Sequence, residues 1–349
     1  MKRTTITTVA GCFLFILLWS SGWIGSKFGL DYAGTFTLLT YRYIVVVVAL
    51  LAFVTFTKAW RKIPRSQLVL HIMVGVLSHA VYLGAGNSAM QFGVSAGSVA
   101  FIAALQPMLT ATMSSGVSGE RTSNRQWFGL GLGFIAIMAV IWDKLSLGGS
   151  FVAYMLPFVG IIAISLASVI DRRISLKNEA EKVEATPLSL VCLIHCSSAL
   201  FAILPLALVV EGFETQWSGE LIFSILWLGI LVSLGAYSMM FFMLRNMSAT
   251  KVACLEYVAP PATMVIAYFM LGESLTIIDA IAILVAAIAV WLVMSTRPVA
   301  GKAMVVNAVS LTRKAASDRM LSDEAVRDLL ARARQRHPNS RYQPDTLTF

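Results

Sequence analysis

One carboxylate, Glu256, stands inside a long apolar stretch of this sequence. A carboxylate within a membrane span costs about 2.5–3.5 kcal/mol, so such a group usually has a function. Glu256 could bind a substrate amine or carry a coupled proton. The alternative is a position one turn from the membrane surface, where it would pair with Lys251 or Arg245.

Two cations, Lys27 and Arg42, lie near the ends of the first two apolar stretches. One interpretation is a cationic patch that meets a substrate carboxylate, flanked by Trp19 and Trp23. The other is a structural pairing with Asp31, in which long basic side chains extend toward the membrane surface.

Prolines interrupt two further apolar stretches, at Pro107 and Pro260. Proline removes a backbone donor and kinks a helix, and the freed carbonyls must then face protein or a wet cavity. This pattern favours a bent, cavity-lining gate, and a packing kink is the alternative. The candidate substrate-binding and gating residues are therefore Trp19, Trp23, Lys27, Arg42, Tyr82, Gln106, Pro107, Thr110, Glu256, Tyr257, Pro260 and Thr263.

Metal ligation was considered for one helix face, which carries Cys192, His195 and Cys196. These residues fall at i, i+3 and i+4, and their side chains could meet. No fourth ligand is evident in the sequence, and cysteine is an ordinary buried residue. We therefore expect no metal and no cofactor.

The elements that must position these residues are membrane helices. Hydrophobic residues make up 58% of the 349, charged residues 13%, and the mean hydropathy is +0.78. This composition excludes a soluble globular enzyme, a disordered chain and a disulfide scaffold. Ten apolar stretches are long enough to cross a bilayer. We place them at residues 8–27, 36–57, 68–89, 95–117, 126–142, 151–170, 187–210, 221–244, 252–271 and 277–295.

Basic residues are distributed unequally between alternate links. The side that holds the N-terminus has 24 of the 27 Lys and Arg residues. Positively charged loops stay in the cytoplasm, so both termini are expected there, in a multi-pass protein of the cell inner membrane. The net charge of +9 follows from this topology and does not indicate nucleic-acid binding.

An internal repeat appears when the chain is shifted by 153 residues, which places Pro107 on Pro260 and Gly119-Glu120 on Gly272-Glu273. Between residues 95 and 136, ten ungapped positions are then identical. Two halves of five helices each cross the membrane an odd number of times, so the second half is inverted. Inverted repeats are a recurring device of alternating-access transporters. We expect an all-α integral membrane protein with repeats at 1–145 and 146–295 and a tail at 296–349.

This organisation resembles the drug/metabolite transporter (DMT) superfamily, in its EamA type. The resemblance rests on the paired proline and Gly-Glu landmarks, on the run from Trp19 to Lys27 and on Arg42. It implies a small-molecule exporter with a central cavity lined by helices one to four and six to nine, with helices five and ten at the periphery.

The tail carries ten Lys or Arg against five Asp or Glu. Residues 322–336 are typical of a short amphipathic helix in a basic cytoplasmic segment. It could contact anionic lipid or a protein partner, or be a solvated appendage. A homodimer through Gly129 and Gly133 is one option, and packing within the chain is the other.

We therefore expect a secondary transporter that exports amino acids or other small metabolites across the membrane, and not an enzyme. The alternatives are a polytopic sensor or channel and, with less support, a membrane enzyme. No Walker A sequence and no His-Glu-x-x-His pattern occurs in the chain.

The role of Glu256 gives the first prediction. If Glu256 contributes to coupling or substrate selection, Glu256→Gln should reduce transport or remove its pH dependence, because the amide keeps the shape and loses the titratable charge. Transport assays across a pH series would measure this. Full transport with an unchanged pH profile would contradict the hypothesis.

Overall fold

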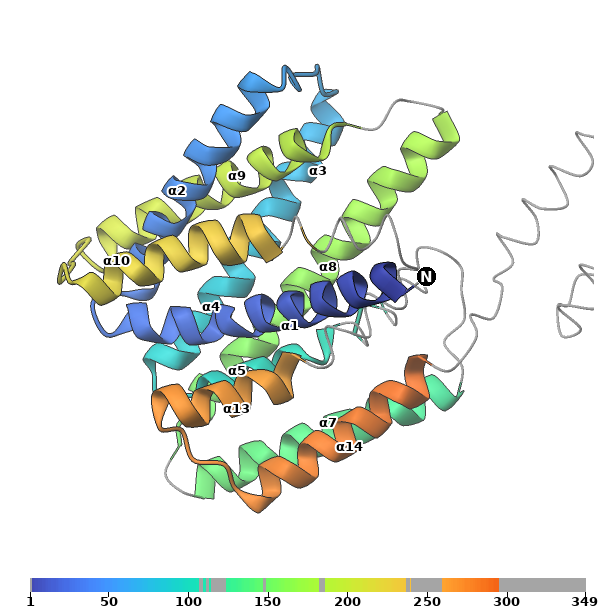
Figure 1. Cartoon of the computed structure of the whole chain (residues 1–349), viewed down its shortest axis with the longest axis vertical. Coiled ribbons are helices and arrows are strands. Elements are labelled where there is room, and N and C mark those ends of the chain that lie inside the picture. The colour runs from blue at the N-terminus through green and yellow to red at the C-terminus, as the bar shows by residue number, and fades with distance from the viewer. Residues whose placement is uncertain are drawn as a thin grey trace, which may run out of the picture.

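The computed structural model describes residues 2–106, 109–110, 113, 124–146, 149–181, 186–236, 239 and 259–294. Pro107, Glu256, Tyr257, Gly119-Glu120 and the tail lie outside these residues. The described chain is helical throughout and forms ten helical stretches (Figure 1). They are α1 (Lys2–Leu30), α2 (Thr35–Phe56), α3–η1–α4 (Arg65–Gly75, Val76–Val81, Tyr82–Gln91), α5 (Ala96–Ala103), α7 (Asn124–Ser146), α8 (Phe151–Glu181), α9 (Leu188–Val209), α10–η2 (Gly219–Leu226, Trp227–Ala236), α13 (Ala259–Leu271) and α14 (Ile277–Met294).

Length and composition make six of these stretches candidate membrane spans. They are Gly11–Leu30, Thr35–Phe56, Arg65–Gln91, Phe151–Ser175, Leu188–Val209 and Gly219–Ala236. Large apolar side chains also point outward, including Phe56 at 86% exposed, Val209 at 84% and Phe269 at 79%. An apolar outer surface of this kind is suited to lipid rather than water.

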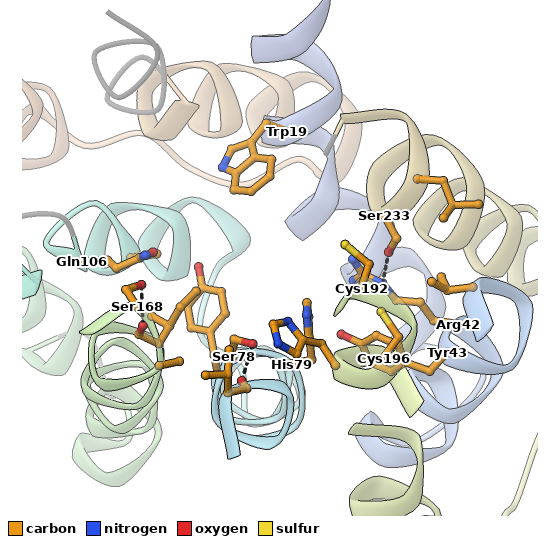
Figure 2. Close-up of a pocket in the computed structure, with 18 of the residues that line it drawn as sticks. Trp19, Arg42, Tyr43, Ser78, His79, Gln106, Ser168, Cys192, Cys196 and Ser233 are labelled. Carbon is orange, nitrogen blue, oxygen red and sulfur yellow. Dashed lines mark hydrogen bonds between the residues drawn. The ribbon is translucent and has the colours of Figure 1, made fainter. Parts of the chain in front are cut away.

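Two of the helices contain π-helical segments that the sequence did not predict. η1 lies in the third stretch and η2 in the eighth. Shifted by the 153 residues of the repeat, Val76–Val81 falls on Gly229–Leu234, inside η2. π-helical turns are rare and frequently occur at functional sites. Here they carry Ser78, His79 and Ser233, whose side chains lie around the same interior space (Figure 2).

The first five stretches pack against the last five in a reciprocal pattern (Figure 1). α2 packs against α9, α5 against α13, and α7 against α14. α1 packs against α10 and η2, and α4 and η1 pack against α8. The first three contacts join helices of equal rank in the two sets of five. In the last two contacts, the first stretch packs against the eighth and the third stretch packs against the sixth. A two-fold relation between the two sets of five turns each of these contacts into the other.

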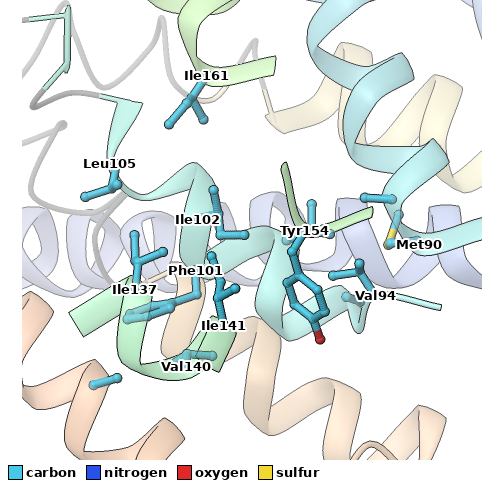
Figure 3. Close-up of a cluster of buried hydrophobic side chains, with 14 of the residues drawn as sticks. Met90, Val94, Phe101, Ile102, Leu105, Ile137, Val140, Ile141, Tyr154 and Ile161 are labelled. Carbon is cyan, nitrogen blue, oxygen red and sulfur yellow. The ribbon is translucent and has the colours of Figure 1, made fainter. Parts of the chain in front are cut away.

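The largest buried cluster holds one end of the molecule together (Figure 3). Phe101 and Ile102 of α5 meet Ile137 and Ile141 of α7 there, next to Tyr154 of α8. All five side chains are at most 5% exposed. This cluster fixes α5 against the peripheral helix α7.

Small residues let α1 approach α10 and η2 closely. The stripe Ser21, Gly25 and Gly29 faces those two elements: Trp227 Nε1 donates to Ser21 Oγ at 2.9 Å, and Ser224 Oγ donates to the Gly25 carbonyl at 2.6 Å. A Cβ at Gly29 would lie 2.6 Å from Ser224 Oγ. Close approach through small residues is the usual way in which membrane helices associate.

Glutamates from distant segments cap two helix N-termini. Glu273 accepts hydrogen bonds from the backbone N–H groups of Ala96 at 2.7 Å and Gly97 at 3.2 Å, which begin α5. Gly272 has a φ of +66° and turns the chain after α13 so that Glu273 reaches α5. Glu211 accepts in the same way from Phe36 N and Thr37 N at the start of α2. A carboxylate at a helix N-terminus satisfies orphan N–H groups and complements the helix dipole.

Two helix ends differ from the sequence expectation. α8 continues to Glu181, so the predicted end at residue 170 and the polar link from Asp171 were wrong. Asp171, Arg172 and Arg173 lie inside the candidate span, which ends at Ser175, and the helix continues for six residues beyond it. α5 ends at Ala103 and is followed by a turn at Ala104 and Leu105, inside the predicted span 95–117, so the helix breaks just before Pro107, where a kink was expected.

The contact between α3 and α9 depends on the absence of a side chain at Gly75. A Cβ there would lie 2.5 Å from the His195 carbonyl oxygen and 2.6 Å from its Cα. One turn earlier, His71 shares the same face of α3. The two helix backbones are therefore nearly in contact at this point.

Removing the Glu273 carboxylate should destabilise the protein. Glu273→Ala leaves the first N–H groups of α5 without their acceptor, so we expect a loss of about 1–2 kcal/mol. Thermal unfolding in detergent would measure it. Glu181→Ala is the matched control, because Glu181 is 52% exposed and pairs with the exposed Lys177 at 3.8 Å on the surface of α8. Equal effects of the two variants would contradict the capping role.

A methyl group at Gly75 should force α3 and α9 apart. We expect Gly75→Ala to lower the free energy of unfolding by about 1–3 kcal/mol, the usual penalty of overpacking. Gly131→Ala is the control, because nothing lies within 4 Å of a Cβ at that position on α7. Unfolding of both variants under the same conditions tests the contact, and an unchanged stability of Gly75→Ala would refute it.

Candidate functional site

A cavity of about 1130 Å³ lies among the helices of both halves (Figure 2). Its walls come from α1, α2, the α3–η1–α4 stretch, α5, α8, α9, η2 and α13. Of the described residues, none on α7 or α14 lines it. This is the arrangement that the family resemblance implied, with the fifth and tenth helices outside.

An aromatic group forms one wall of the cavity. Trp19 and Trp23 project from α1, and Tyr82 stands edge-on to Trp23 with the ring centroids 5.8 Å apart. Gly86 lies beneath Trp23, because a Cβ there would come within 2.5 Å of the indole. The wall is thus fixed by close packing and offers a large apolar surface to a ligand.

Arg42 supplies a buried cation to the same cavity. The residue is 5% exposed, and its Nε donates to Ser233 Oγ on η2 at 3.0 Å. In Figure 2 the side chain bridges from α2 to the π-helical segment. A guanidinium carries five N–H donors, and this hydrogen bond uses Nε, which is not one of the terminal amino groups that grip a carboxylate end-on.

The other predicted residues fall into three groups. Gln106, Pro260 and Thr263 line the cavity with Trp19, Trp23, Arg42 and Tyr82. Lys27 and Thr110 are not among the lining residues, and Lys27 donates to the Met90 carbonyl at 3.1 Å. Pro107, Glu256 and Tyr257 lie outside the described residues.

Thr263 also has a packing role. Its Oγ1 donates to the Ser20 carbonyl at 3.1 Å, and Ser20 Oγ donates back to the Ala259 carbonyl at 3.2 Å. Thr263 and Ser20 are fully buried. This reciprocal pair joins α1 to α13 at the cavity wall.

The cavity contains a carboxylate that the sequence analysis missed, Asp171. The residue follows the apolar part of α8 and was assigned to a link. The continuous helix instead directs it inward. The sequence signal was present: Asp171 is one residue from the last apolar position and is spaced by four and seven from the cavity residues Ala167 and Ile164.

A row of four rings begins beside Arg42 at the cavity wall and ends at His71, which is not itself a lining residue. Tyr43 lies 5.7 Å from His79, His79 lies 6.4 Å from His195, and His195 lies 5.4 Å from His71, measured between ring centroids. His71 Nδ1 and His195 Nε2 are 3.2 Å apart. With an Asp171 oxygen, these two nitrogens form a set in which all atoms lie within 4.8 Å of one another.

Several proteins of known sequence are similar to this chain. A "Probable amino-acid metabolite efflux pump" of Salmonella typhimurium is 24% identical over 275 residues, covering 75% of this chain and 86% of that protein. An "Uncharacterized transporter" of Archaeoglobus fulgidus is 26% identical over 268 residues, covering 74% and 88%. An uncharacterized inner membrane transporter of Escherichia coli K12 is 24% identical over 296 residues, covering 83% and 92%.

A solved crystal structure shares the fold. The similarity has a TM-score of 0.57 at 19% sequence identity and covers 81% of this chain and 94% of the other. Sequence models of one family match the chain twice, at residues 6–142 and 152–295, with the description "EamA-like transporter family". The two matches cover both sets of five helices and all the walls of the cavity. This multi-pass membrane chain therefore belongs to the EamA-like transporter family, within the DMT superfamily.

Proposed function

We propose that the chain is a secondary transporter built from two inverted five-helix repeats that works by alternating access. Three independent observations support the repeat: the shared proline and Gly-Glu landmarks, the π-helical segments at equivalent positions and the reciprocal helix packing. The cavity lies between helices of both sets, which is where the substrate site of an inverted-repeat transporter is found.

The proposed orientation places both termini in the cytoplasm and the protein in the cell inner membrane. The bias of 24 of 27 basic residues toward one side supports it. Lys58, Arg61, Arg172 and Arg173 lie on that side, at or beyond the ends of α2 and of the α8 span. On this orientation, Asp171 and His71 lie toward the cytoplasmic end of the cavity.

The proposed substrates are amino acids or other small metabolites that carry a carboxylate. The observation that carries this proposal is Arg42, a buried cation in an otherwise largely apolar cavity. A buried arginine is costly unless paired, and a bidentate carboxylate would supply the missing charge. The aromatic wall would cover the rest of the substrate. The efflux-pump names of two relatives at 24% identity agree with export.

The proposed gate consists of Pro107 and Pro260 with the residues next to them. The turn at Ala104 and Leu105 breaks α5 just before Pro107, and Gln106 borders the cavity there. Glu256 and Tyr257 remain predictions for the same region of the ninth helix. A break in each of two equivalent helices would let the cavity open alternately to the two sides of the membrane.

Replacing Arg42 should remove recognition of the substrate carboxylate. We expect Arg42→Ala to weaken amino-acid binding about 10- to 100-fold, the loss of one or two charge-assisted hydrogen bonds. The measurement is a thermal-shift screen of purified protein against each proteinogenic amino acid, because a ligand stabilises the state that it binds. A stabilising amino acid is then tested for exchange in proteoliposomes.

Arg125→Ala is the matched control for this experiment. The substitution Arg125→Ala makes the same chemical change on α7, outside the cavity. The Arg125 guanidinium lies 5.1 Å from the Trp291 ring centroid. The variant should keep both the thermal shift and the exchange. A ligand that stabilises Arg42→Ala as well as the unchanged protein would overturn the carboxylate proposal, and an absence of exchange with every stabilising ligand would overturn transport of that class.

A further inference from the structure

Two of the four histidines of the chain, His79 and His195, line the cavity, and the ring of His71 lies directly next to that of His195. His71 and His195 present ring nitrogens 3.2 Å apart, and an Asp171 oxygen completes a set within 4.8 Å. His337, the fourth histidine, lies outside the described residues. The amino-acid proposal makes no use of this group.

The spacing of the two nitrogens suits a shared metal ion. In a tetrahedral zinc site with Zn–N bonds of about 2.0–2.1 Å, two ligand nitrogens are separated by roughly 3.3–3.4 Å. The observed 3.2 Å is close to that edge. Without an ion, the same distance fits a hydrogen bond in which one imidazole donates its N–H to the other. An ion would take the place of that proton.

The third group fits the same chemistry. Asp171 needs to move by at most about 1.5 Å toward the two nitrogens to reach the tetrahedral spacing, a distance within a rotation of its carboxylate. Two imidazoles and one carboxylate are ligands for a borderline transition metal such as Zn²⁺, whereas Mg²⁺ and Ca²⁺ prefer oxygen alone.

We propose that His71, Asp171 and His195 form a binding site for one divalent transition-metal ion of the Zn²⁺ class. The site has an entry path, because Asp171 and His195 line the cavity. Three protein ligands leave a fourth coordination position, which would hold water or a ligand from solution. Cys192, one turn before His195, is not within the set of mutually close ligand atoms in the described chain.

The fold positions His71 firmly. On α3, Gln67, His71 and Gly75 follow one another at four-residue spacing and share a face. Gln67 Nε2 donates to Asn178 Oδ1 of α8 at 2.7 Å, and Gly75 allows the backbone of α9 to approach. His71 lies between these two contacts. It is 3% exposed and is directed toward α8 and α9 at once.

An ion in this site would join the two halves of the transporter. His71 belongs to the first family match, whereas Asp171 and His195 belong to the second. If the halves move relative to each other during transport, the ion binds best to the conformation in which α3, α8 and α9 are close. It would then stabilise that conformation by its differential affinity.

The experiment measures metal binding to the full-length protein in detergent, purified without a histidine tag and stripped with a chelator. Zn²⁺ is titrated by calorimetry, and Co²⁺ is followed by visible absorption, which reports four-coordinate ligation. We expect one ion per chain and no comparable binding of Mg²⁺. His71→Gln, His195→Gln and Asp171→Asn should each weaken Zn²⁺ binding on the order of 100-fold or more.

Two control variants test the assignment. His79→Gln removes the neighbouring ring of the same row, and Cys192→Ser removes the thiol that lies one turn before His195 on α9. Both should bind Zn²⁺ within about twofold of the unchanged protein. If a ligand variant fails to fold, the unchanged protein still tests the proposal, because its metal-binding stoichiometry and its Co²⁺ spectrum are measured without any substitution.

Three results would overturn the proposal: no stoichiometric Zn²⁺ or Co²⁺ binding, a Co²⁺ spectrum typical of a hexahydrated ion, or control variants that lose as much affinity as the ligand variants. The outcome is independent of the proposed substrate. Arg42→Ala should keep metal binding, and a protein that transports no amino acid can still bind Zn²⁺.

Discussion

The fold depends on one constraint, that no backbone polar group is left unpaired where water is absent. Helices solve this internally except at their first N–H groups and their last C=O groups. At two helix starts, side chains from elsewhere in the chain solve it. Glu211 and Glu273 supply the missing acceptors at the starts of α2 and α5, and each comes from a segment more than 170 residues away in sequence. α2 carries Arg42 about two turns after its cap, and α5 carries the cavity residue Ala100 one turn after its cap. The two carboxylates therefore fix the positions of two cavity walls by satisfying helix ends in the other half of the chain.

Glycine contacts determine how closely these walls approach. Gly29 brings α1 against α10, Gly86 seats Trp23 against α4, and Gly75 brings α3 against α9. Within a membrane, no hydrophobic drive pulls apolar helices together, so shape and hydrogen bonds decide the packing. At Gly75 this closeness has a chemical consequence. It places two imidazoles at 3.2 Å, a separation that larger side chains on α3 would not permit.

The sequence predicted the class of the fold because composition alone excludes a water-soluble core, and long apolar stretches in a membrane have to be helices. It also predicted several cavity residues, Arg42 and Trp23 among them, because polar or aromatic side chains inside a membrane span usually have a structural or functional role. It did not predict the π-helical segments, which have no sequence signature of their own. It did not predict that Asp171 lines the cavity, because a charge after an apolar run usually marks the end of a membrane span. The meeting of His71 with His195 is set by tertiary packing across 124 residues, which periodicity within one helix cannot reveal.

The two groups that we propose to bind ligands are unlike in chemistry and lie apart along the row of rings. Arg42 is held by Ser233 of η2, and the imidazole–carboxylate set lies beyond His79, the π-helical residue of η1. Both groups join the first half of the chain to the second: Arg42 bridges α2 to η2, and His71 meets residues of α8 and α9. A ligand that contacts both sides at either end gains its full binding free energy only when the halves are close there. α7 and α14 pack on each other outside this region, so a change in the opening need not disturb their contact. The same two-sided placement that recognises a ligand thus gives it a means of selecting the conformation of the transporter.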